Sequence, residues 1–179
     1  MIIKNKTIKI IKDKDIFKKV KFEKPEKYQK RITVKGIIKN PKNNKFAFVT
    51  NEVHNFILLA GGGAESDNLE EEINRECQEE IFYSIKNIKK NTEVLEFRNR
   101  NAKEYQTVCF YGEIDKKIEE DRRTTDEKNN GLKLVWLDLG EALDIMKKQV
   151  EKVKRGEVEF YNTAFNIIRD FYFLKEYEK

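Results

Sequence analysis

Apolar and β-branched residues concentrate in short segments whose spacing predicts strands in the first third of the chain. Thr7–Ile11 predicts a short strand, and Arg31–Ile38 and Phe46–Thr50 predict two longer ones. Residues 40–44, with the sequence NPKNN, have turn chemistry, so the two longer strands are expected to form a hairpin. Phe56–Leu59 predicts another short strand, which leads directly into three consecutive glycines.

The second half of the chain predicts three more strands. Thr92–Arg98 alternates apolar and polar residues, and Glu104–Glu113 is rich in aromatic and β-branched residues. Residues 99–103 contain two asparagines and are expected to join these strands as a hairpin loop. Ser84–Asn91, which precedes them, is lysine-rich and is interpreted as a connection. Leu132–Leu137 predicts the last strand and carries the only tryptophan, Trp136.

Two helices are expected after the last strand. A short one runs from Asp138, a predicted N-cap, to about Met146. A long one covers Val158–Tyr177. The residues expected on its packed side are Phe160, Ala164, Ile167, Ile168, Phe171 and Leu174. No internal repeat and no domain-scale linker interrupts this order of elements, which indicates a single α/β domain.

The segment with the most chemical information is Gly61–Tyr83, in which a glycine turn precedes a predicted helix. Residues 69–82 contain neither proline nor glycine, and Asp67 or Ser66 is the expected N-cap. At about 100° per residue, two faces separate. The core face holds Leu69, Ile73, Cys77 and Ile81. The adjoining acidic arc holds Glu72, Glu76, Glu79 and Glu80, with Arg75 beside it and able to reach Glu79 or Glu71.

Four carboxylates on one arc repel each other, which makes this a poor plain surface. Hard oxygen ligands at i, i+3 and i+4 suit Mg²⁺ or Mn²⁺, whose charge would remove the repulsion. The alternative is a solvated acidic face, which is common in proteins rich in Lys and Glu. The preceding glycines, Gly61, Gly62 and Gly63, favour the metal site, because they allow close backbone approach to a phosphate or a packed ion.

The glycines, the short acidic loop and the run Arg75-Glu76-Cys77-Gln78-Glu79-Glu80 resemble the Nudix box, G-x5-E-x7-R-E-U-x-E-E-x-G-U. The predicted elements around the box, from residue 30 to about 175, also resemble a whole Nudix domain. The resemblance implies a Nudix-type α/β/α sandwich with a mixed β-sheet. Residues 30–179 would then form the Nudix hydrolase domain, and residues 1–29 an N-terminal strand and approach segment of the same domain.

Three positions depart from the family pattern. Asp67 stands where the family usually has Glu, if Gly61 is the glycine in register; with Gly62 or Gly63 in that part, the loop is shortened. Phe82 replaces the glycine that usually ends the helix, and Tyr83 follows at the last hydrophobic place. Because phenylalanine does not readily adopt the left-handed conformation, the helix is expected to run on slightly.

The resemblance implies metal-dependent hydrolysis of a pyrophosphate bond in a nucleoside diphosphate linked to another moiety. The implied metal ligands, for Mg²⁺ or Mn²⁺, are Glu76, Glu79 and Glu80, with Arg75 orienting a carboxylate of the box. Gly61, Gly62 and Gly63 are the implied substrate-binding residues. Asp67 and Glu72 are secondary candidates, for orientation and for an outer metal contact. A Nudix-like domain that binds a nucleotide or a protein without turnover is the alternative.

Residues outside the box leave several interpretations open. A general base could come from Glu119, Glu120, Asp126 or Glu127, although solvated loop charges are the stronger interpretation. His54 could contact substrate, or be an ordinary loop histidine. Four aromatic residues could stack on a base, with core packing preferred for most of them: Tyr105, Phe110, Tyr111 and Trp136. Cys77 and Cys109 are expected to be free, buried and without a catalytic role.

Composition narrows the classes of partner. Charged residues make up 39% of the 179 residues, hydrophobic residues another 39%, and the formal net charge is +5. Lysines are scattered among acids without an arginine-rich face, so nucleic acid is not the expected partner, although an RNA-binding or decapping role stays a third hypothesis. With no signal peptide or apolar run of membrane-spanning length, we expect a cytoplasmic protein. Many relatives are homodimers, so a homodimer is also considered.

Overall fold

The computed structural model describes residues 8–50, 55–121, 125 and 131–179 and contains a six-stranded sheet. The strands are β1 (Lys9–Lys12), β2 (Gln29–Lys39), β3 (Phe46–Thr50), β4 (Tyr83–Arg98), β5 (Lys103–Lys117) and β6 (Lys133–Leu137), in the order β1-β4-β5-β2-β3-β6. Two neighbouring pairs are parallel, β1 with β4 and β2 with β5, and the other three are antiparallel. The sheet is therefore mixed, as predicted.

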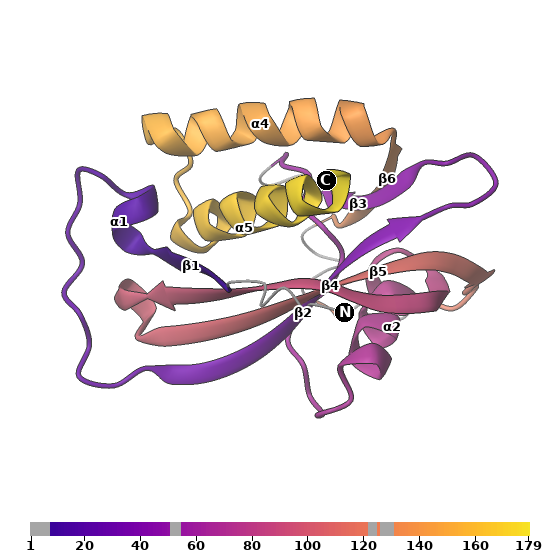
Figure 1. The fold of residues 1–179 in the computed structure, drawn as a ribbon, viewed down its shortest axis with the longest axis horizontal. Coiled ribbons are helices and arrows are strands. Elements are labelled where there is room, and N and C mark those ends of the chain that lie inside the picture. Colours follow the sequence, from indigo (N-terminus) through magenta and orange to yellow (C-terminus); the bar gives the residue numbers. More distant parts are fainter. Residues whose placement is uncertain (1–7, 51–54, 122–124, 126–130) are drawn as a thin grey trace, which may run out of the picture.

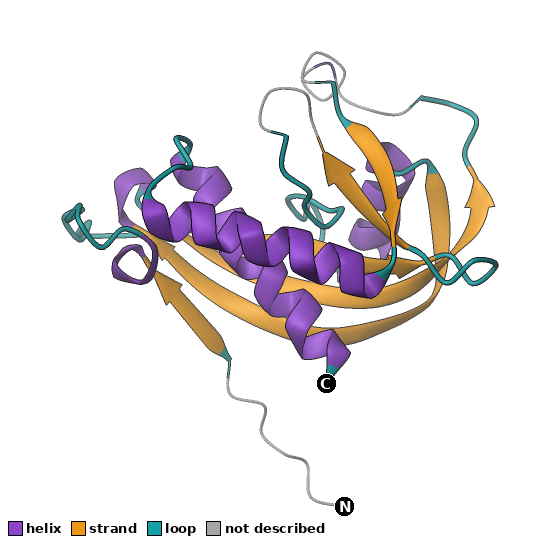
Figure 2. Ribbon diagram, turned by 90° about the horizontal axis from the view of Figure 1, so that it is seen from above, coloured by secondary structure: helices purple, strands orange, loops and turns teal. Residues whose placement is uncertain are grey.

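Helices cover both faces of the sheet (Figure 1). Helix α2 (Leu69–Glu80) lies on one face, whereas α4 (Leu139–Arg155) and α5 (Tyr161–Glu178) lie together on the other. Seen from above, α4 and α5 cross in front of the long strands (Figure 2). The short α1 (Asp13–Ile16) follows β1 at one end of the molecule. This arrangement is an α/β/α sandwich and confirms the predicted fold class.

Each face of the sheet has its own apolar core. The core under α2 joins Ile73, Cys77 and Ile81 of the helix to sheet residues such as Val34 and Val108. The larger core under α4 and α5 is centred on fully buried phenylalanines and aliphatic residues, among them Phe48, Phe165, Phe173, Leu59 and Met146. In the part of the chain that the structure describes, no helix is long and apolar enough to cross a membrane.

Strand β4 is twice as long as the sequence indicates. The predicted strand, Thr92–Arg98, is its second half, and the lysine-rich stretch before it was interpreted wrongly as a connection. Pairing with β5 is irregular there, with register shifts between Tyr83 and Ile85 and between Lys86 and Lys89, and another between residues 90 and 92. Because each bulge inverts the alternation of side chains, the first half of the strand has no period-2 pattern.

The predictions for the C-terminal helices need three corrections. Helix α4 continues to Arg155 and ends at Gly156, whose φ of 76° is the left-handed conformation of a helix C-cap. Asp138 stands at the N-cap position of α4, but its side chain makes no capping hydrogen bond. Phe160, predicted on the packed side of α5, precedes the helix as its N-cap and is 47% exposed.

Candidate active site on helix α2 and the glycine turn

Helix α2 positions its side chains by burying the predicted core stripe. Ile73, Cys77 and Ile81 are fully buried beneath the sheet, and Leu69 is partly buried. The N-cap is Asn68, whose Oδ1 accepts a hydrogen bond from the backbone N–H of Glu71 at 3.4 Å. The predictions of Asp67 or Ser66 as the cap were therefore wrong by one or two residues. Burial of the stripe leaves the acidic arc facing the glycine turn.

The helix ends abruptly, contrary to the expectation that it would run on. Glu80 is its last residue, and the backbone N–H of Ile81 donates to the carbonyl of Cys77. Phe82 then adopts a φ of 62°, the left-handed conformation that glycine would occupy in the family pattern. A hydrogen bond from the N–H of Ile118 to the carbonyl of Phe82, at 2.8 Å, helps to hold it there. The tertiary structure thus imposes a conformation that phenylalanine disfavours by about 1–2 kcal/mol.

The glycine turn occupies the gap where β2 and β3 diverge. The predicted strand Phe56–Leu59 is not formed; isolated bridges instead join Leu58 to Val49 of β3, and Ala60 to Gly36 of β2. Gly61 has a φ of 127°, and a Cβ there would lie 2.2 Å from the carbonyl oxygen of Val34. Only glycine fits at this position, because β2 passes directly against the turn.

Lys35 of β2 fixes the turn from beneath. Its side chain is buried, and its Nζ donates to the carbonyl of Leu59 at 2.9 Å and, at shorter range, to the carbonyl of Gly61. The N–H of Gly61 in turn donates to Oε2 of Glu80 at 2.5 Å. Lys35 therefore links the sheet to the turn, and the N–H of Gly61 links the turn to α2. The sequence analysis missed this residue, because a lysine within an otherwise apolar strand was its only signal.

Arg75 is the centre of the acidic arc. Its guanidinium contacts Glu72 at 2.9 Å, Glu76 at 2.7 Å and Glu79 at 2.8 Å. It also donates to the carbonyl of Gly63 at 3.1 Å. The predicted contact with Glu79 is present. The orienting contact considered for Asp67 is made instead by Glu72, whereas Asp67 lies exposed on the loop.

Glu76 packs directly against the turn. A Cβ on Gly62 would lie 2.7 Å from Oε2 of Glu76, so a side chain at this position would displace the carboxylate. Burial raises the pKa of Glu76, although the charges of Arg75 and Lys35 oppose the rise. The hydrogen bond from Arg75 lowers the pKa of Glu72. Burial lowers the pKa of Arg75, but its bond to Glu72 and the neighbouring carboxylates outweigh that effect and raise it.

The site carries an excess of negative charge. Four carboxylates, Glu72, Glu76, Glu79 and Glu80, face Arg75 and Lys35, and the guanidinium of Arg31 lies against Gly63 of the turn. Among the described residues, the carboxylates outnumber these cations, and carboxylate oxygens are the ligands that Mg²⁺ and Mn²⁺ prefer. The chemical type of these ligands therefore fits such an ion. In the conformations described, Arg75 holds the carboxylates, and within the described ranges no three acidic, histidine or cysteine side chains converge as a ready-made metal site.

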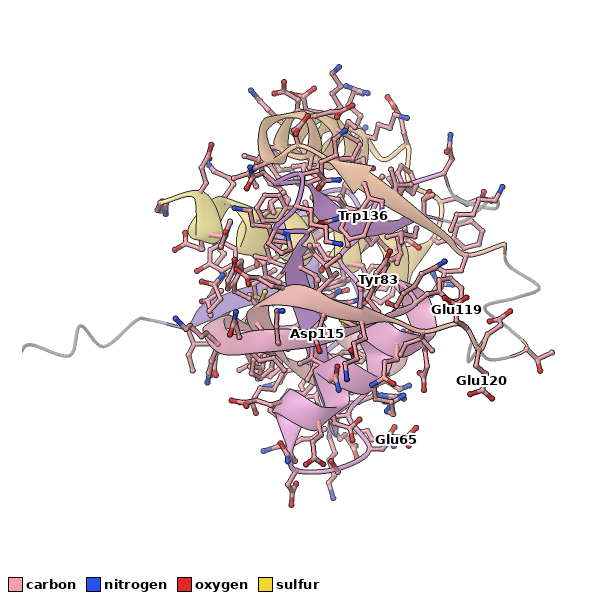
Figure 3. All side chains as sticks on the ribbon, turned by 90° about the vertical axis from the view of Figure 1, so that its right-hand side faces the viewer. Glu65, Tyr83, Asp115, Glu119, Glu120 and Trp136 are labelled. Atoms are coloured by element: carbon pink, nitrogen blue, oxygen red, sulfur yellow. The ribbon has the colours of Figure 1, made fainter. Side chains whose placement is uncertain are left out.

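The proposed general bases lie outside this cluster where they are described. Glu119 is an exposed side chain that lies 4.0 Å from Nζ of Lys117, and Glu120 is exposed beside it after β5 (Figure 3). This placement agrees with solvated loop charges. Asp126, Glu127 and His54 lie outside the described residues.

The aromatic candidates divide into packed and accessible ones. Phe110 is buried in the core under α2, and Tyr111 stacks on Tyr177 with ring centroids 5.4 Å apart. Tyr105 packs against the guanidinium of Arg98, which lies 4.3 Å from its ring centroid. Trp136 is only partly buried, and its ring meets that of Tyr83 edge to face at 6.0 Å (Figure 3). Phe110, Tyr111 and Trp136 belong to the apolar cores or pack against them, so core packing is correct for these three, and Tyr105 packs on Arg98 instead.

Both cysteines are free and buried, as predicted. Burial raises the pKa of the Cys77 and Cys109 thiols, so neither presents a reactive thiolate.

Comparison with solved structures identifies the fold. The chain is similar to a Nudix hydrolase from Nitrosomonas europaea, with a TM-score of 0.52, 17% identity, and coverage of 80% of this chain and 89% of that one. It also matches MutT, in a structure from work on the proteins of Aliivibrio salmonicida and Vibrio cholerae, with a TM-score of 0.47, 15% identity, and coverage of 72% and 99%. No protein-family model and no curated protein matches the chain. The chain therefore has the fold of the Nudix hydrolases, which confirms the resemblance at the level of fold.

Proposed function

We propose that the protein is a metal-dependent hydrolase that cleaves a pyrophosphate bond in a nucleoside diphosphate linked to another moiety. The observation that carries the proposal is the cluster of carboxylates around Arg75, packed against a turn that only glycine can form. The cluster lies at the position of the Nudix box in a chain with the Nudix fold. Both the residues and their setting therefore support the same chemistry.

Each residue of the cluster has a distinct role in this proposal. Glu76, Glu79 and Glu80 would hold Mg²⁺ or Mn²⁺, and the bound ion would supply the charge that polarises a pyrophosphate and lowers the pKa of a water molecule. Arg75 keeps the carboxylates on one side of α2, with Glu72 fixing its guanidinium. Gly61, Gly62 and Gly63 let the turn pack closely against β2 and the carboxylate of Glu76, and they are the proposed contacts for the substrate phosphates. Lys35 keeps the turn in register with the helix.

A panel of nucleotides tests the proposal directly. The panel should contain oxidised nucleotides, nucleotide sugars and capped RNA, and phosphate-containing products should be measured with Mg²⁺ and with Mn²⁺. We expect Glu79→Gln and Glu80→Gln each to lower turnover by more than about 100-fold. Losing a residue that only orients a metal ligand already lowers activity by up to about 100-fold, and losing the ligand itself should cost at least as much. Glu70→Gln, on the exposed part of the same helix, is the matched control and should keep its activity.

Metal binding can be measured without turnover. Mn²⁺ should raise the melting temperature of the wild type and of Glu70→Gln, and raise that of Glu80→Gln far less, because a bound ion stabilises only the folded chain. If the melting temperature of the wild type is independent of both ions, the proposed metal ligands are wrong.

A domain that binds nucleotide without turnover is the second candidate. It is favoured by the pairing of Arg75 with three carboxylates, which already neutralises part of the acidic arc. In that case nucleotides should raise the melting temperature of the wild type and of Glu79→Gln alike, and no product should form with either ion. Product formed by the wild type and lost in Glu79→Gln would reject this candidate.

A further inference from the structure

A cavity of about 720 Å³ is lined by residues of α1, of the segment that follows it and of the end of β4. In Figure 1, these elements lie at the opposite end of the molecule from α2. The size of the cavity is within the range of about 300–1,000 Å³ that is typical of small-molecule sites. No residue of α2 or of the glycine turn lines it. The proposed hydrolase therefore makes no use of this cavity.

Two pairs of aromatic rings form the apolar part of the lining. Phe17 and Phe22 meet edge to face, with centroids 5.6 Å apart, and Tyr28 and Phe97 do the same at 5.3 Å. Phe17 also stacks on Tyr161 of α5, with centroids 5.2 Å apart and an interplanar angle of 10°. The rings are thus attached to the main core, so the segment presents a fixed aromatic surface.

Hydrogen bonds between polar groups of the lining connect the segments that form the cavity. The carboxylate of Asp13 accepts from the hydroxyl of Tyr161 at 2.5 Å and from the backbone N–H of Asn99 at 2.9 Å. The side chain of Asn99 accepts from the hydroxyl of Tyr28 at 2.6 Å and donates to the carbonyl of Phe22 at 3.1 Å. These bonds preorganise the cavity, and they leave the aromatic rings and the charged side chains as the surfaces that would meet a ligand.

The charged part of the lining is positive. The lining lysines are Lys12, Lys14, Lys18, Lys21 and Lys24, all of them exposed. Among the described lining residues only Asp13 and Glu26 are acids, which leaves a formal excess of three positive charges in this set. The Nζ of Lys12 lies 5.8 Å from the ring centroid of Phe97, so cation and aromatic surface adjoin. The lining therefore complements a ligand that is aromatic and anionic at once.

We propose that this cavity is a second ligand site, which binds a small aromatic anion. The aryl group packs against the rings of Phe17, Phe22, Tyr28 and Phe97, and the acidic group faces the lysines. A purely aliphatic anion would lose the aromatic contacts, and a neutral aryl compound would lose the attraction of the lysines. The site is independent of the carboxylate cluster on α2, so its ligand need not be the substrate.

A fluorescent aromatic sulfonate tests the proposal on the full-length protein. We expect 8-anilinonaphthalene-1-sulfonate to bind one site with increased emission, and to bind more weakly as ionic strength rises from about 0.01 M to 1 M. The neutral analogue 1-anilinonaphthalene should bind at least about tenfold more weakly. Octanoate, an aliphatic anion, should displace the probe poorly. Equal binding of the neutral analogue, or efficient displacement by octanoate, would overturn the proposed ligand class.

Two lining variants and a control locate the binding. Lys18→Gln combined with Lys21→Gln should weaken probe binding by about three- to tenfold, since each exposed ion pair contributes modestly. Val20→Glu adds a carboxylate to the lining at a residue that is 51% exposed, so it should weaken binding without unfolding the chain. The control, Lys147→Gln with Lys148→Gln, removes the same charge from an exposed part of α4 outside the lining. Equal affinity in all four proteins, or no binding to the wild type, would reject the site.

Discussion

The two faces of the sheet each carry a group of interacting charged residues, and the two groups are built differently. Under α5, Glu96 and Asp170 pair with Arg98 and Arg169, and all four side chains are almost completely buried. Beside α2, Arg75 contacts three carboxylates in a partly open setting. The first group is balanced in charge, whereas the second, even with Lys35 included, has an excess of negative charge.

The difference indicates that the charged residues under α5 stabilise the fold, whereas those on α2 have a functional role. In the balanced group, asparagines add to the hydrogen bonding, although Nε of Arg98 and Nη2 of Arg169 make no hydrogen bond to the described residues. Arg98 donates to Asn162 at 3.1 Å and to Asn166 at 3.0 Å. The N–H of Leu59 donates to Asp170 at 3.0 Å, which ties the group to the segment before the glycine turn. Such a group needs no further ion. The cluster on α2 leaves carboxylates in excess, which is the condition under which a divalent cation is bound.

The largest effect should come from breaking the balanced group. Arg169→Met leaves Glu96 and Asp170 buried with one cation fewer, and it should lower the free energy of unfolding by about 3–5 kcal/mol. Urea denaturation followed by circular dichroism measures this change. Arg155→Met is the control, because Arg155 pairs with Glu157 at the surface; it should cost less than about 1 kcal/mol. Similar losses in the two variants would contradict a structural role for the balanced group.

A smaller loss of stability is expected for a variant of Lys35, because this residue supports both the fold and the glycine turn of the candidate site. Lys35→Met leaves the carbonyls of Leu59 and Gly61 without their charged donor and should cost about 2 kcal/mol. Because the turn also loses its anchor, we expect turnover to fall by more than the loss of folded protein explains. Lys30→Met, at an exposed lysine of the same strand, should change neither quantity. A loss of stability at normal turnover per folded molecule would limit Lys35 to the fold.

The smallest effect concerns the end of α2. Phe82→Asn and Phe82→Ala both remove the aromatic ring, but asparagine tolerates the left-handed conformation better than alanine. The Asn variant should therefore be more stable than the Ala variant by about 1 kcal/mol. Thermal denaturation of the two proteins measures the difference. Equal melting temperatures would show that the chain after α2 relaxes out of the left-handed conformation.

Sequence patterns predicted the regular elements of the fold better than the irregular ones. The hairpin of β2 and β3, the core stripe of α2 and the contact of Arg75 with Glu79 follow from local periodicity and helical spacing. The first half of β4 does not, because its bulges remove the alternation that marks a strand.

Features that depend on contacts between distant parts of the chain could not be predicted from local sequence patterns. Phe82 adopts a conformation that its own chemistry disfavours, and Asn68 rather than Asp67 begins the helix. Lys35 has its role because the glycine turn crosses it, although the two are more than twenty residues apart. The residues of the α2 cluster were identified by the motif, but the pairing of Arg75 with Glu72 and Glu76 required the structure.

The parallel pairing of β2 with β5 has a consequence for the order of folding. The β4–β5 hairpin closes over a short loop, whereas the hydrogen bond between Thr33 and Thr107 joins residues 74 positions apart. Pairings between distant segments form slowly, because the entropy of a long loop must be overcome first. The glycine turn pairs with β2, and α2 packs on residues of both β2 and β5, so the cluster between the turn and α2 needs β2 in place beside β5. We therefore expect the carboxylate cluster to be among the last parts of the molecule to form during refolding.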